Sequence, residues 1–164
     1  MLNFIVLVFT FLFLFFFDRL ISLLFAPFYI LSLIPIVCLL FLLFNRSTTA
    51  FAWGIVYGVL KEIGHTPYIG VTSVSICIAI MAVTVLRKTL FVHEGLGSTF
   101  ASGIIFFSIY FIQSFIFSFY FSIELFQEWV VFVLVNTIIS FVVYFFIKMI
   151  QTQLHKRFII DHET

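Results

Sequence analysis

The chain has 164 residues, of which 64% are hydrophobic and 9% are charged, and its formal net charge at pH 7 is +1. Charged residues make up about a quarter of an ordinary globular sequence. This composition therefore excludes a soluble enzyme, a secreted disulfide-rich domain and a disordered linker. The nearly neutral charge favours neither nucleic acid nor an acidic substrate. We expect an all-α polytopic membrane protein whose first partner is the lipid bilayer, with no nucleic-acid partner.

A transmembrane helix needs roughly 20 mainly apolar residues, so six spans would nearly fill this chain. Scarce charged and turn residues separate six apolar segments, and we predict one integral membrane domain over residues 1–164. Its predicted spans are 2–17, 27–44, 47–63, 68–86, 98–121 and 129–150. Residues 151–164 are predicted to form a polar cytoplasmic tail.

The boundaries of the first two spans depend on charge and proline. The first span is expected to end at Asp18-Arg19, and residues 20–26 to form a short interfacial segment. Pro27 suits the first turn of the second span, where a missing N–H costs nothing. Pro35 is then expected to kink that span, because a proline inside a helix removes one hydrogen bond and clashes with the preceding turn.

The basic residues predict the orientation. With the N-terminus in the cytoplasm, six basic residues lie inside and two lie outside, which is the usual positive-inside bias. Those inside are Arg46, Arg87, Lys88, Lys148, Lys156 and Arg157, and those outside are Arg19 and Lys61. Both termini are therefore expected to be cytoplasmic.

The third span carries small residues at a spacing of four. Ala50, Gly54 and Gly58 share one helix face, and Glu62 follows on the same face one turn later. Such faces allow close approach of two helices in lipid. Two interpretations stay open, namely packing inside this chain and contact with another protein.

Candidates for enzymatic or metal chemistry are weak. The sequence contains no glycine-rich phosphate loop, nucleophile elbow or zinc-protease motif. His65 lies in a turn without a second ligand nearby, and the tail residues His155, Asp161, His162 and Glu163 match no standard zinc spacing. We predict a protein that is not an enzyme and has no cofactor and no metal.

A family resemblance is carried by the run from Gly54 to Gly70. Here Glu62 stands four residues after Gly58, and Gly70 stands eight residues after Glu62 at the opening of the next predicted span. This pattern resembles the central signature of MreD, the rod-shape-determining membrane protein, in which the acid is usually aspartate. Asn136, early in the sixth span, and the basic end of the chain are similar to that family's C-terminal pattern.

The resemblance implies a fold and a function. The implied fold is a six-transmembrane-helix bundle similar to the substrate-binding subunits of energy-coupling-factor transporters. The implied function is a non-catalytic scaffold of the bacterial cell-elongation machinery in the inner membrane, involved in cell shape and peptidoglycan synthesis. Its expected partners are an MreC-like single-span protein, the MreB filament system and the peptidoglycan synthases.

The alternative from another class is a substrate-binding subunit of an energy-coupling-factor vitamin transporter. Such subunits use alanines on the first span to dock their partner, whereas residues 1–17 of this chain contain no alanine. They also need polar groups that converge on a ligand pocket. Polar residues expected on the outer side of this chain are sparse.

Overall fold

The computed structural model describes residues 2–24, 32–63, 70–89, 95–118 and 123–160. Six α-helices and no strand occur in these ranges, which confirms the all-α class. Two stretches of the described chain, Val71–Thr89 and Phe126–Gln153, are long and apolar enough to cross a membrane. The helices are α1 (Leu2–Leu24), α2 (Leu33–Leu43), α3 (Ser47–Glu62), α4 (Val71–Thr89), α5 (Leu96–Ser118) and α6 (Ile123–Ile160).

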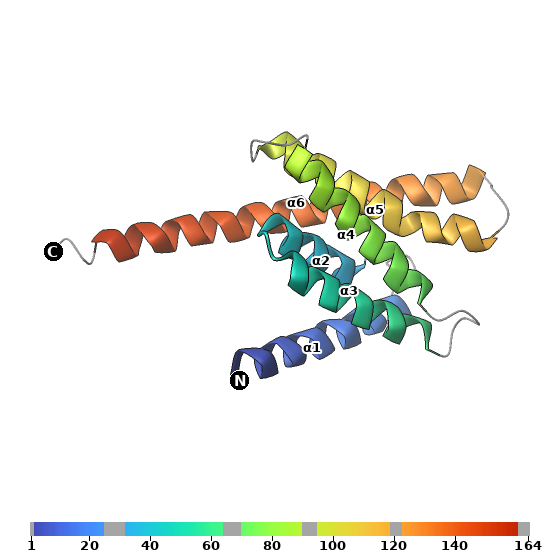
Figure 1. Cartoon of the computed structure of the whole chain (residues 1–164), viewed down its shortest axis with the longest axis horizontal. Helices are drawn as coiled ribbons and strands as arrows, with labels where there is room; N and C mark the ends of the chain where they lie inside the picture. The colour runs from blue at the N-terminus through green and yellow to red at the C-terminus, as the bar shows by residue number, and fades with distance from the viewer. Residues whose placement is uncertain (1, 25–31, 64–69, 90–94, 119–122, 161–164) are drawn as a thin grey trace.

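The short helix α2 forms the centre of the bundle. Its sequence is apolar on every side, and eight of its eleven residues are buried. A helix that is apolar on every side is buried, either by other helices or by lipid. Accordingly, α2 contacts each of the other five helices, whereas α3, α4, α5 and α6 pack in sequence order around it (Figure 1).

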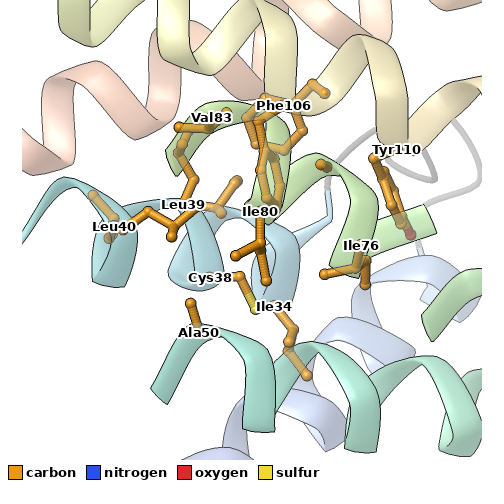
Figure 2. Close-up of a cluster of buried hydrophobic side chains, with 14 of the residues drawn as sticks. Ile34, Cys38, Leu39, Leu40, Ala50, Ile76, Ile80, Val83, Phe106 and Tyr110 are labelled. Atoms are coloured by element: carbon orange, nitrogen blue, oxygen red, sulfur yellow. The ribbon is translucent and has the colours of Figure 1, made fainter. Parts of the chain in front are cut away.

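The core lies around α2 and draws on its neighbours. Figure 2 shows Ile34, Cys38 and Leu39 of α2 facing side chains from α4 and α5. Aromatic rings extend this core, since Phe107 and Tyr110 of α5 both lie against the ring of Phe132 on α6. Among the described phenylalanines there are therefore both core and surface residues, because others, such as Phe13 on α1, are exposed on the outside of the bundle.

The predicted kink at Pro35 is wrong. Helix α2 begins at Leu33, so Pro35 is its third residue and lies in the first turn. The N–H groups of a first turn have no partner inside the helix, so a proline there removes no hydrogen bond. Pro27, the residue expected in that first turn, lies outside the described residues.

Two helices continue past the ends that were predicted for them. Helix α1 runs without a break through Asp18-Arg19 to Leu24, so its last turns replace part of the expected interfacial segment 20–26. Helix α6 has 38 residues and includes most of the expected tail, up to Ile160. Its C-terminal half extends well beyond the other helices (Figure 1).

Candidate functional site

Gly54 and Gly58 lie where α3 packs against α4. A Cβ atom added to Gly58 would overlap the backbone nitrogen and the hydroxyl of Ser73, and one added to Gly54 would lie 2.5 Å from Cγ2 of Ile76. The hydroxyl of Ser73 also donates a hydrogen bond of 3.0 Å to the carbonyl oxygen of Ile55. This face is therefore used for packing inside the chain, the first of the two interpretations of the small-residue pattern.

Ala50 begins the same face but has a different environment. It is completely buried at the start of α3 and belongs to the core cluster that includes Cys38 and Leu39 (Figure 2). Its small side chain lets α3 approach α2, whereas Gly54 and Gly58 let the same helix approach α4. The small-residue face thus serves two successive helix contacts.

Glu62 caps the N-terminus of α4. Its carboxylate accepts hydrogen bonds from the backbone N–H groups of Gly70 and Thr72, on either side of the first residue of that helix. Those N–H groups have no partner inside the helix, and the helix dipole favours a negative charge there. Glu62 is buried, with 4% of its surface exposed, so a neutral side chain without an acceptor would leave these donors unsatisfied.

Gly70 is required by the backbone at this junction. Its φ angle is +107°, a conformation that residues with a Cβ atom rarely adopt. It thereby presents its N–H to Glu62 immediately before α4 begins. The structure thus brings Gly58, Glu62 and Gly70 together at one helix–helix junction.

Asn136 caps a different helix, α2. Its side-chain oxygen accepts a hydrogen bond of 3.1 Å from the backbone N–H of Ser32, and its amide nitrogen donates to the carbonyl oxygen of Phe132 at 2.8 Å. The residue is fully buried. Asp18 accepts the next backbone N–H, that of Leu33, at 2.8 Å. Side chains from α1 and α6 therefore satisfy the buried start of α2.

Asp18 also belongs to a polar cluster between α1, α3 and α5. Its second carboxylate oxygen accepts a hydrogen bond of 3.2 Å from the hydroxyl of Tyr57. The ammonium group of Lys61 donates to the hydroxyl of Tyr110 at 2.9 Å and lies over the rings of both tyrosines. Arg19 completes the cluster by donating to the carbonyl oxygen of Lys61 at 2.9 Å.

Sequence reasoning missed most of this cluster. The sequence pattern predicts the end of a span at Asp18 and Arg19. It gives no sign that Tyr57 and Tyr110 form hydrogen bonds between helices. One signal was present, because the apolar residues continue after Arg19 as they do before Asp18. Ionisable residues that interrupt an apolar stretch without ending it usually face the interior of a bundle.

The described residues contain no group of three His, Cys, Asp or Glu side chains that could hold a metal ion. His65 and the tail residues 161–164 lie outside the described part of the chain, and the side chain of His155 is not described. The geometry of the described polar groups supports helix capping and hydrogen bonding between helices.

No protein-family model, curated protein or solved structure matches this chain.

Proposed function

We propose that this chain is a six-span protein of the bacterial inner membrane and a non-catalytic scaffold of the cell-elongation machinery. Support for the membrane placement comes from α4 and α6, which are long and apolar enough to span a bilayer. Further support comes from the basic residues, whose uneven distribution favours cytoplasmic termini. The remaining helices are expected to complete the bundle in the bilayer.

One observation carries the proposal of a scaffold related to MreD. Gly58, Glu62 and Gly70, which carry the family resemblance, form one junction between α3 and α4. Each has a distinct role there: close helix contact, capping, and a backbone conformation that needs glycine. A signature whose members form one structural unit is better support for kinship than spacing alone.

The polar chemistry supports a structural role. Asp18, Glu62 and Asn136 each accept a hydrogen bond from a backbone N–H at the start of a helix, and these bonds stabilise the bundle. A vitamin-binding subunit would instead need polar groups that converge on a ligand. We therefore favour the scaffold over the transporter subunit.

The expected partners are an MreC-like single-span protein and, through it, the MreB filament system and the peptidoglycan synthases. The outside of α1 offers an apolar surface for lipid or a partner span, since Phe9, Phe13 and Phe16 are each about two-thirds exposed. Packing of apolar side chains, rather than expulsion of water, would drive such an association in a membrane.

Depletion in a rod-shaped host tests the proposal. We expect depleted cells to become round or wide, and the tagged protein to co-purify with an MreC-like single-span protein. Restoration of shape by the wild-type chain serves as the control. Normal cell shape combined with lost vitamin uptake would refute the scaffold and favour the transporter subunit.

A further inference from the structure

A groove of about 870 Å³ lies between α1, α2 and the C-terminal half of α6. Figure 1 shows the N-terminal half of α1 and the C-terminal half of α6 diverging on this side of the bundle. Apolar side chains, including Leu14, Val37 and Phe41, form most of its wall. Thr10, Arg46 and Gln151, which are all exposed, are polar residues of its lining.

The charged residue Arg46 and the apolar residues Val37 and Leu14 lie at different positions along the groove. Arg46 follows the C-terminal end of α2, whereas Val37 lies nearer the start of that helix. In the proposed orientation Arg46 is on the cytoplasmic side, and Val37 and Leu14 lie deeper in the membrane. The groove thus has the polarity of an amphipathic ligand with a charged end and an apolar body.

The depth of the groove matches one leaflet of the bilayer. On α1 the lining residues extend from Val6 to Leu14, which corresponds to a rise of about 12 Å. The hydrocarbon core of a bilayer is about 30 Å thick, so one leaflet contributes about 15 Å. A partner helix that crossed the membrane would need a groove of about twice this length. The dimensions therefore favour a lipid over a transmembrane helix.

One charged group, the guanidinium of Arg46, can recognise the head of such a lipid. Among the described residues the guanidinium of Arg46 makes no hydrogen bond or ion pair, and arginine binds phosphate through two parallel hydrogen bonds. The ring of Trp53 also lines the groove, whereas its indole N–H is enclosed by the protein.

We propose that this groove binds an anionic phospholipid of the leaflet on the Arg46 side. The phosphate lies at Arg46, and the acyl chains lie along α1 and α2 against Leu14 and Val37. The inner leaflet is rich in anionic lipids, which attract basic side chains at its surface. This inference rests on the proposed membrane placement and is independent of the proposed role in cell elongation.

Native mass spectrometry of the purified full chain tests the site. The protein is extracted in mild detergent, and bound phosphatidylglycerol is measured against added phosphatidylcholine. We expect Arg46→Gln to reduce retained phosphatidylglycerol about tenfold, the factor expected for loss of one hydrogen bond to a charged group in the groove. Lys88→Gln, which removes an exposed basic residue at the end of α4, is the matched control and should retain wild-type binding.

A second pair of variants tests the apolar part of the groove. Val37→Trp would fill the groove and should displace the lipid, whereas Val85→Trp, at a position 58% exposed on α4, should not. Circular dichroism on each variant checks that the helices are retained.

Three results would overturn the proposal. These are equal retention of phosphatidylglycerol by the Arg46→Gln variant and wild type, equal binding of phosphatidylcholine, and a homodimer that Val37→Trp dissociates. The last result would assign the groove to a second copy of the chain. Because these measurements need no elongation partner, failure of the lipid site and failure of the scaffold role are distinguishable.

Discussion

Replacement of Glu62 by leucine is expected to destabilise the bundle strongly. The carboxylate accepts backbone hydrogen bonds from Gly70 and Thr72, and leucine offers no acceptor. Each buried donor left without a partner costs about 1–3 kcal/mol. Two such donors therefore predict a loss of about 2–6 kcal/mol, a large fraction of the roughly 5–15 kcal/mol that stabilises a typical protein.

A second variant, Glu62→Gln, keeps one of the two oxygen acceptors of Glu62. It removes the negative charge from the N-terminus of α4 and places an amide NH2 donor where the second oxygen accepted a backbone N–H. A charge at a helix end contributes about 0.3–1 kcal/mol when exposed and up to ~2 kcal/mol when partly buried. Both variants lose this charge, but Glu62→Gln leaves one backbone N–H without an acceptor and Glu62→Leu leaves two. We therefore expect the loss for Glu62→Gln to be smaller by about 1–3 kcal/mol.

Unfolding of the purified protein in detergent micelles, followed by the fluorescence of Trp53 and Trp129, measures these losses. Glu128→Gln on α6 is the control, because Glu128 is exposed and its replacement should change stability by less than about 1 kcal/mol. Wild-type stability in Glu62→Leu would refute the capping role. Equal losses in the two Glu62 variants would refute the proposed importance of the acceptor atoms.

Three further substitutions test the helix contacts by the same assay. Gly58→Leu should abolish close packing of α3 on α4 and prevent stable folding, because its Cβ would overlap the backbone of Ser73. Gly97→Leu is the control and should be tolerated, because a Cβ there meets open space. Equal stability of the two variants would contradict the close contact. Asn136→Leu should cost about 1–3 kcal/mol by leaving a buried N–H of α2 without an acceptor, and an unchanged unfolding midpoint would contradict this. Pro35→Ala should destabilise by about 1 kcal/mol, since proline in a first turn restricts the unfolded chain, whereas a stabilised variant would favour the kink that the structure lacks.

The helical class and the small-residue face were accessible from the sequence because both depend on local spacing. Residues four apart share a helix face whatever the rest of the chain does, so the alignment of Gly54, Gly58 and Glu62 needed no structure. The opposing helix was not accessible in this way. Contact with Ser73 and Ile76 depends on how α3 and α4 meet, and no local rule specifies that angle.

Charged residues show more clearly which features can be predicted from local sequence and which depend on the tertiary structure. By position in the sequence, Asp18-Arg19 was a plausible end of a span, because charges usually mark the membrane surface. The structure instead places Asp18 against the start of α2 and the hydroxyl of Tyr57. A charge inside a bundle is stable when hydrogen-bond donors surround it. The donors to Asp18 are the N–H of Leu33 and the hydroxyl of Tyr57, which are 15 and 39 residues away in the sequence.

The sequence by itself determined that this chain is helical and strongly apolar, and it singled out Gly54, Gly58, Glu62 and Gly70 among the residues of the α3–α4 junction. Only the tertiary structure decided what those residues do there, with glycine allowing contact and glutamate capping a helix. It also decided that α2, one of several apolar segments in the sequence, is the central helix. The physical reason is that apolar periodicity and chain breaks are local properties, whereas the acceptors for a buried helix start come from distant segments. Asn136 and Ser32, which are 104 residues apart, show this most clearly.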